Sequence, residues 1–209
     1  MNPSTRRRRV VALVLLGLGL AWAGAATAAK PACGTPEECF RSFTQTQREV
    51  RSVEARFRQV KEIALLRDPL VSSGRFEFAR DRGVRWEVEE PEPMVIEISG
   101  DRLRAGAPGE LRDVDAGSSG ELLGQLGGLF SGEGGADRFT ISAGATPGAI
   151  RLQPRDPSLA RIVSAIELEV DAEVGVPRSV QIEEVGGDRT RIEMSDVEVE
   201  RTPEAGSAP

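Results

Sequence analysis

Histidine is absent from the 209 residues of this sequence, and so are several familiar catalytic and nucleotide-binding motifs. Without histidine the chain has no Ser-His-Asp triad, no Cys-His pair and no histidine-ligated metal site. The nucleophile elbow, the phosphate-binding loop and the dinucleotide fingerprint do not occur either. Acidic pairs such as Glu87 with Glu89 alternate with apolar residues, which predicts a solvated face where pKa tuning is difficult. We therefore predict that the chain is not an enzyme and has neither a cofactor nor a metal site.

Long hydrophobic runs are also scarce, and the clearest one extends from Val10 to Ala23. It follows four arginines at 6–9 and precedes the small-residue series at 26–28. This order is typical of a secretory signal; the alternative, a membrane anchor, needs a longer stretch to cross the hydrocarbon layer. We expect residues 1–28 to be a cleaved signal peptide, residues 29–201 to form one domain, and residues 202–209 to be a disordered tail.

Cysteine is limited to Cys33 and Cys39. In an oxidising compartment the simplest expectation is one disulfide that closes a short loop, worth about 2 kcal/mol. The alternative, a redox-active pair, needs two intervening residues, and five intervene here.

Without residues 1–28 the chain keeps 23 basic and 33 acidic residues, for a net charge of −10. Such an acidic surface repels phosphate groups, so we expect no nucleic-acid partner and no stable adsorption to an anionic membrane.

The residues from Thr35 to Glu38 predict the start of a helix, with threonine as the cap, proline at the first position and glutamate three residues after the cap. We expect this helix over residues 36–49. Its apolar residues, including Phe40 and Phe43, form a narrow stripe, which predicts that the helix lies on another apolar surface.

From residue 50 onward apolar and charged residues alternate, which predicts about ten half-buried strands. Their connections, such as Gly83 and the turn at 186–188, are too short for parallel crossovers, so the sheet must be largely antiparallel. We predict a mainly β fold, a half-open antiparallel β-barrel with an N-terminal helix.

A glycine-rich stretch lies between Gly106 and Gly148, where 12 of the 23 glycines occur. Within it, leucines and a phenylalanine have helical spacing but are interrupted by glycines, which predicts a weak apolar helix. Such a segment can fold onto an apolar surface and leave it again, as a movable lid does. The alternative is a poorly ordered insertion that fills a gap in the core. The candidate lid residues are Leu122, Leu126, Leu129 and Phe130.

One helix and one weak segment provide little cover for the apolar face of so long a sheet, and a lined hydrophobic cavity is a plausible result. The same strand pattern also permits a solid sandwich core. The cavity would offer few hydrogen-bonding partners, so an acyl chain fits it better than a sugar or a nucleotide. The candidate lining residues are Phe57, Phe76, Phe78, Trp86, Val88, Met94, Ile96, Ile98, Ile166 and Leu168.

Arg80 has two interpretations. If the strand of Phe76 and Phe78 continues, Arg80 falls on their face, where its guanidinium needs acceptors such as the carbonyls of a weak helix. If the strand ends at Ala79, Arg80 points into water from a turn.

A series of residues along the chain occurs in a characteristic order. These are Val53, Ala55, Phe57 and Gln59, then Gly74, Phe76, Arg80, Arg85, Trp86 and Pro91, and later Pro154, Ile166 to Val170, Pro177, Ile182, Gly187, Asp188, Thr190 and Ile192. In this order and spacing the chain resembles the LolA-type outer-membrane lipoprotein carriers of Gram-negative bacteria, over roughly residues 50–197.

This resemblance implies a periplasmic carrier whose lidded half-barrel holds the acyl chains of lipoproteins. It also implies an inner-membrane ABC transporter as donor and an outer-membrane protein as acceptor. In that family an arginine before a proline bonds lid carbonyls in the closed state, and Arg80 occupies the matching position. We expect the carrier to be a monomer.

Two departures from the family pattern concern the cargo. Asp81 replaces the proline, and residues 103–106 replace an aromatic cluster. The cargo is therefore expected to be a lipoprotein or another exported lipid, such as a glycolipid. A structural or sensory domain of the envelope with the same fold is the alternative function.

Overall fold

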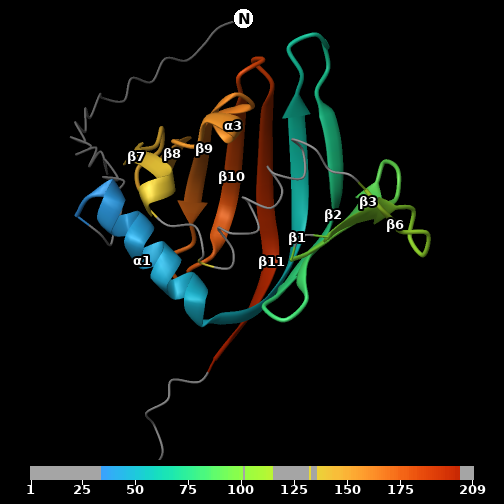
Figure 1. Ribbon diagram of the computed structural model, residues 1–209, viewed down its shortest axis with the longest axis horizontal. Coiled ribbons are helices and arrows are strands. Elements are labelled where there is room, and N and C mark those ends of the chain that lie inside the picture. The colour runs from blue at the N-terminus through green and yellow to red at the C-terminus, as the bar shows by residue number, and fades with distance from the viewer. Residues whose placement is uncertain (1–33, 101, 115–131, 133–135, 203–209) are drawn as a thin grey trace, which may run out of the picture.

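A computed structural model describes residues 34–100, 102–114, 132 and 136–202 (Figure 1). Helix α1 (Pro36–Glu49) precedes the strands, and two short helices, η1 (Ala136–Arg138) and α3 (Pro157–Ala160), lie among them. The strands are β1 (Val50–Glu62), β2 (Leu70–Ala79), β3 (Gly83–Glu90), β4 (Met94–Ser99), β5 (Arg102–Gly106), β6 (Arg112–Asp113), β7 (Phe139–Ala143), β8 (Ile150–Pro154), β9 (Val163–Val170), β10 (Pro177–Glu184) and β11 (Arg189–Arg201).

These eleven strands form one antiparallel sheet in the order β6-β5-β4-β3-β2-β1-β11-β10-β9-β8-β7. The first and last long strands, β1 and β11, are paired at its centre, and each half of the sheet continues outward as a series of hairpins. The sheet is open, since β6 and β7 do not pair with each other. The predicted mainly β, half-open antiparallel fold with an N-terminal helix is thus confirmed.

Helix α1 begins and ends at the predicted residues because local signals define both ends. The Thr35 hydroxyl accepts a hydrogen bond from the Glu38 amide at 3.2 Å, and the Glu38 carboxylate accepts one from the Thr35 amide at 3.1 Å. Pro36 occupies the first turn, and the backbone becomes extended at Val50, where β1 begins. This capping box satisfies amides that a helix start otherwise leaves unpaired.

The apolar stripe of α1 packs on the part of the sheet formed by β7 and β8. The Phe40 ring lies 6.2 Å from the Phe43 ring and 6.3 Å from that of Phe139 at the start of β7. Ile166 and Leu168 on β9 are fully buried in the same core. In Figure 1, α1 accordingly lies along the β7–β9 side, on the other side of the molecule from β3–β6.

The opposite face of the sheet carries charged residues in cross-strand pairs. Arg151 on β8 lies 2.6 Å from the Glu183 carboxylate and 3.7 Å from that of Glu167. The hydrogen bond from Arg151 is the largest influence on Glu183 and holds the pKa of this carboxyl below its usual value. Such pairs stabilise a solvated face modestly, by up to about 1 kcal/mol each.

Several predictions concern residues outside the described ranges, namely the signal peptide at 1–28 and the tail beyond 202. Thr202 itself is described, and its amide donates a hydrogen bond to the carbonyl of Glu49 at 2.9 Å. Within the described ranges no helix has the length and apolar character needed to cross a membrane.

Candidate functional site: the apolar face of the sheet

The strand register places all ten candidate lining residues on one face of the sheet. Across β4, β3, β2 and β1 the side chains form three apolar rows, because residues directly opposite each other in a ladder point to the same side. The rows are Met94-Val88-Gly74-Phe57, Ile96-Trp86-Phe76-Ala55 and Ile98-Val84-Phe78-Val53. The first row continues through Met194 of β11, and its neighbour Ile192 lies opposite Val180, which lies opposite Leu168.

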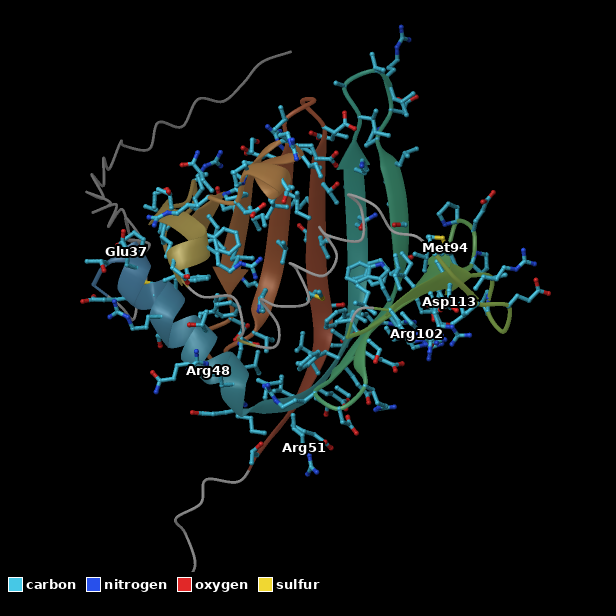
Figure 2. The ribbon with its side chains drawn as sticks, in the orientation of Figure 1. Glu37, Arg48, Arg51, Met94, Arg102 and Asp113 are labelled. Carbon is cyan, nitrogen blue, oxygen red and sulfur yellow. The ribbon has the colours of Figure 1, made fainter. Side chains whose placement is uncertain are left out.

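This apolar face has two unequal halves. On β8–β10, on the α1 side of the sheet, most apolar side chains of this face are buried, as Ile166 and Leu168 show, whereas Ile141 on β7 and Val170 at the end of β9 are half-buried. On β3–β5 the corresponding side chains are only half-buried, and Met94 at the start of β4 is 41% exposed; Figure 2 labels it on the β3–β6 side of the molecule. The half-buried residues are Val84, Trp86, Val88, Ile96, Ile98 and Leu103. We call the apolar face of β1–β5 the open half.

An aromatic cluster lies at the centre of the open half. The Trp86 ring is stacked at 4.1 Å on Phe57 from β1 and meets Phe76 from β2 edge-on at 5.7 Å. Phe57 and Phe76 are buried, whereas Trp86 remains half-buried. The cluster therefore presents the indole as the accessible part of a rigid apolar surface.

Gly74 occupies the row between Phe57 and Val88 and has no room for a side chain. A Cβ atom there would lie 1.9 Å from the carbonyl oxygen of Glu87 on the neighbouring strand. The glycine thus permits close approach of β2 and β3 at a register shift between them.

Arg80 combines parts of both sequence interpretations. Strand β2 ends at Ala79, and Arg80 begins the turn to β3. Its guanidinium nevertheless donates to main-chain carbonyls, at 2.7 Å to Gln47 and at 2.8 and 3.0 Å to Val50. These acceptors belong to the last turn of α1 and its C-cap, where a cation also complements the helix dipole. Figure 2 shows this junction between Arg48 and Arg51.

Gln47 is a residue that our sequence reasoning missed. Its side chain is fully buried at the end of α1, and its Nε2 atom donates to the carbonyl of Gly175 in the β9–β10 turn at 2.6 Å. The Oε1 atom has no hydrogen-bond partner. A signal was available, since Gln47 follows Phe40 and Phe43 at the spacing of one helical face. The end of α1 is thus tied to β9–β10 through Gln47 and to β2–β3 through Arg80.

The candidate lid residues Leu122, Leu126, Leu129 and Phe130 lie outside the described residues. Gly132, which follows them, is described and lies against α1, where its carbonyl accepts a hydrogen bond from Arg48 Nε at 3.5 Å. A Cβ atom on Gly132 would lie 2.7 Å from the carbonyl oxygen of Thr44. The glycine-rich stretch therefore meets α1 closely at this residue.

Cys39 in α1 is disulfide-bonded. Cys33, the other cysteine of the sequence, lies outside the described residues.

A groove of about 730 Å³ lies on the charged face of the sheet. Arginine and glutamate side chains of β1, β3, β10 and β11 line much of it, including Arg56, Arg178, Glu89 and Glu193. Phe57, Gly74 and Met194 of the first apolar row also line it, so the groove combines charged and apolar groups. In the described part of the chain no cluster of three or more acidic or cysteine side chains could hold a metal ion.

Comparison with known proteins gives similarities of fold. No family model and no curated protein matches the sequence. A LolA superfamily protein from Nitrosomonas europaea is 11% identical, with 82% of this chain and 96% of that chain covered and a TM-score of 0.48. The lipoprotein LppX from Mycobacterium tuberculosis is 12% identical over 78% and 94% of the two chains, with a TM-score of 0.45. A DUF1329 family protein from Desulfovibrio piger is 9% identical over 84% and 96%, with a TM-score of 0.44. Function depends on the side chains of this chain.

Proposed function

We propose that this protein is a periplasmic carrier that shields acyl chains of a lipoprotein, or of a related exported lipid, on the open half of its apolar face. The observation that carries the proposal is the unequal cover of one continuous apolar face. Helix α1 buries the β7–β8 side, whereas the side chains of β3–β5 stay half-buried. A large apolar surface that the domain leaves partly accessible is typical of a binding site.

The chemistry of the open half favours hydrocarbon. Its rows consist of aliphatic and aromatic side chains around Trp86, and the charged residues of the same strands point to the other face. A ligand bound there would gain free energy from apolar burial and would find few polar side chains to satisfy hydroxyl or phosphate groups.

Carriage and direct transfer follow from the cost of exposing hydrocarbon to water. At about 0.8 kcal/mol per methylene, a 16-carbon chain that leaves an apolar site for water costs roughly 12 kcal/mol. Release into solution would be too slow for transport, so the cargo must pass between apolar surfaces in contact. We propose an inner-membrane ABC transporter as donor and an outer-membrane protein as acceptor, with a monomeric carrier between them.

We propose that the segment with Leu122, Leu126, Leu129 and Phe130 covers the open half and moves during loading. The contact of Gly132 with α1 supports this, because it brings the end of the segment to the helix. Arg80 would control the same region by holding the carbonyls at the end of α1. Weakening this attachment would let the helix and the cover move together.

The experiment that tests the proposal is native mass spectrometry of the protein extracted from its own periplasm, followed by titration with a fluorescent acyl probe. A carrier copurifies with acyl-bearing molecules and binds the probe, and native lipid displaces the probe. Val185→Ser, at an exposed apolar residue in the turn between β10 and β11, serves as the matched control and should leave probe binding unchanged. A protein that carries no lipid and binds no probe would instead fit a structural or sensory domain of the envelope.

A further inference from the structure

The loop that connects β1 and β2 exposes a group of large apolar side chains that no described element covers. Leu65 is 95% exposed, Leu66 is 50%, and Leu70 and Val71 at the start of β2 are 53% and 45%. Figure 1 shows this hairpin extending beyond the neighbouring strands at the end of the sheet away from the α1–β1 junction. Exposed leucines at the end of a hairpin contribute nothing to the core, so another interaction has to account for them.

The β10–β11 turn enlarges this apolar surface. The Ala64 amide donates to the Asp188 carboxylate at 2.9 Å, and Gly187 lies next to Ala64. Val185, at the start of the same turn, is 58% exposed. Five of the seven large apolar side chains that are exposed in the described part of the chain therefore gather at one end of the sheet. We call these five residues, Leu65, Leu66, Leu70, Val71 and Val185, the apolar tip.

We propose that the apolar tip inserts into the surface of a lipid bilayer and so docks the protein on a membrane. The surface is distinct from the acyl-chain site: Leu65, Leu66 and Val185 lie on connecting loops, and Leu70 and Val71 lie at the end of β2 farthest from Phe76 and Phe78, with only Leu70 on the apolar side of the sheet. Its use in loading or delivering lipid rests on the proposed function.

Area argues for a bilayer and against a second copy of the chain. Five such side chains present on the order of 500 Å², whereas each partner in a stable protein interface contributes roughly 800 Å². A projecting hairpin end has no flat or concave surface to offer another protein. A bilayer is deformable and accepts leucines on a protrusion without a complementary pocket.

Charge argues for insertion through apolar contact. The charged residues beside the tip are paired within the protein: Lys61 lies 3.0 Å from Glu184, and Glu62 lies 3.5 Å from Arg189. The loop itself carries Arg67 and Asp68, of opposite sign. The tip therefore offers no basic patch, and binding should occur on zwitterionic lipid with little dependence on salt.

The test uses vesicles of phosphatidylcholine and the purified protein. The variants are made in a Trp86→Phe background, which removes the indole already present in the open half. Leu65→Trp places an indole at the tip, and Arg82→Trp places one on an exposed residue of the β2–β3 turn, at the other end of β2, as a control. Brominated phosphatidylcholine should quench the fluorescence of the first indole and leave that of the second unchanged. In flotation, the double variant Leu65→Ser, Leu66→Ser should partition at least roughly tenfold more weakly than the parent protein, and Arg82→Ser should match the parent.

Results that differ from these expectations would contradict the docking inference. Equal quenching of the two indoles, or none, would show that the tip does not enter the bilayer. A parent protein that is dimeric and becomes monomeric in the double serine variant would assign the tip to contact between copies. Binding of the acyl probe in solution separates this inference from the proposed function. If the double serine variant binds both the probe and the vesicles as strongly as the parent does, only the docking inference fails. If the parent binds no probe, the carrier proposal fails, whatever the result with vesicles.

Discussion

The Nη2 atom of Arg80 lies 2.7 Å from the carbonyl oxygen of Gln47, and it thereby joins the β2–β3 turn to the last turn of α1. The same guanidinium reaches Val50, the residue at which the helix becomes strand β1. Removing this group would leave helix-end carbonyls without a charged donor. The position of α1 over the sheet therefore depends on a side chain from the other half of the molecule.

Arg80→Leu should lower the free energy of unfolding by about 2 kcal/mol, because each hydrogen bond from a charged donor contributes about 1.5–3 kcal/mol and water compensates in part. Urea unfolding measures this loss. Hydrogen exchange should also become faster at residues 47–51 than in β9 or β10. Arg80→Lys keeps the charge but not the forked donor geometry, so its free energy of unfolding should lie between those of the parent and Arg80→Leu.

If the protein is a carrier, Arg80→Leu should also shift the equilibrium between the closed and open positions of the proposed lid segment, so that cargo is retained or loading is impaired. A transfer assay from loaded protein to acceptor vesicles measures the rate. Transfer at the parent rate by a folded Arg80→Leu protein would count against the proposed latch.

Trp86→Ala should weaken binding of an acyl probe by about tenfold, because it removes the accessible ring of the aromatic cluster. It should also destabilise the fold by about 2 kcal/mol, since the ring packs on Phe57 and Phe76 but is only half-buried. Fluorescence titration at a temperature well below the unfolding midpoint separates the two effects. Trp86→Phe should retain most of the binding; if both variants bind like the parent, Trp86 is not part of the site.

Gly74→Ala should destabilise the protein by about 2 kcal/mol or more, because the added methyl group would meet the Glu87 carbonyl at 1.9 Å. The strands would have to separate locally, next to Phe57 and Val88. Thermal unfolding should show the loss. Gly186→Ala is the matched control, since a Cβ atom there meets nothing within 4 Å, and it should leave the midpoint nearly unchanged.

Arg151→Met should remove a contribution that depends on pH. The hydrogen bond from Arg151 lowers the pKa of Glu183 in the folded protein below its usual value of 4.5, so the stabilisation is complete above that value. It is lost as the pH falls through the lower folded-state pKa. At pH 7 the free energy of unfolding of the parent should exceed that of Arg151→Met by about 1 kcal/mol. This difference in unfolding free energy should shrink in acid, as urea unfolding at several pH values can show.

Arg161→Met, a change at an exposed arginine, is the control, and its difference in unfolding free energy from the parent should not vary with pH. A difference of equal size at pH 7 and in strong acid would exclude this ion pair as its source.

The candidate site could be predicted only in part from the sequence. Alternation identified Phe57, Trp86 and Ile166 as residues of one apolar face, and the register places them there. Alternation could not distinguish Ile166, buried below α1, from Trp86, which is half-buried, because the same period describes both. The difference depends on which strands the helix covers, and that is a contact between distant parts of the chain.

The sequence by itself determined the local elements. The bounds of α1 follow from its capping box and from the extended residue at its end, and short connections require antiparallel neighbours. Tertiary structure alone decided that β1 pairs with β11, that Gln47 bonds to Gly175, and that Arg80 finds its acceptors at the end of α1. Caps and alternation act between residues close in sequence, so a linear pattern records them. These other contacts join residues more than 30 positions apart, and they exist only after the sheet has curved and the helix has packed on one of its halves.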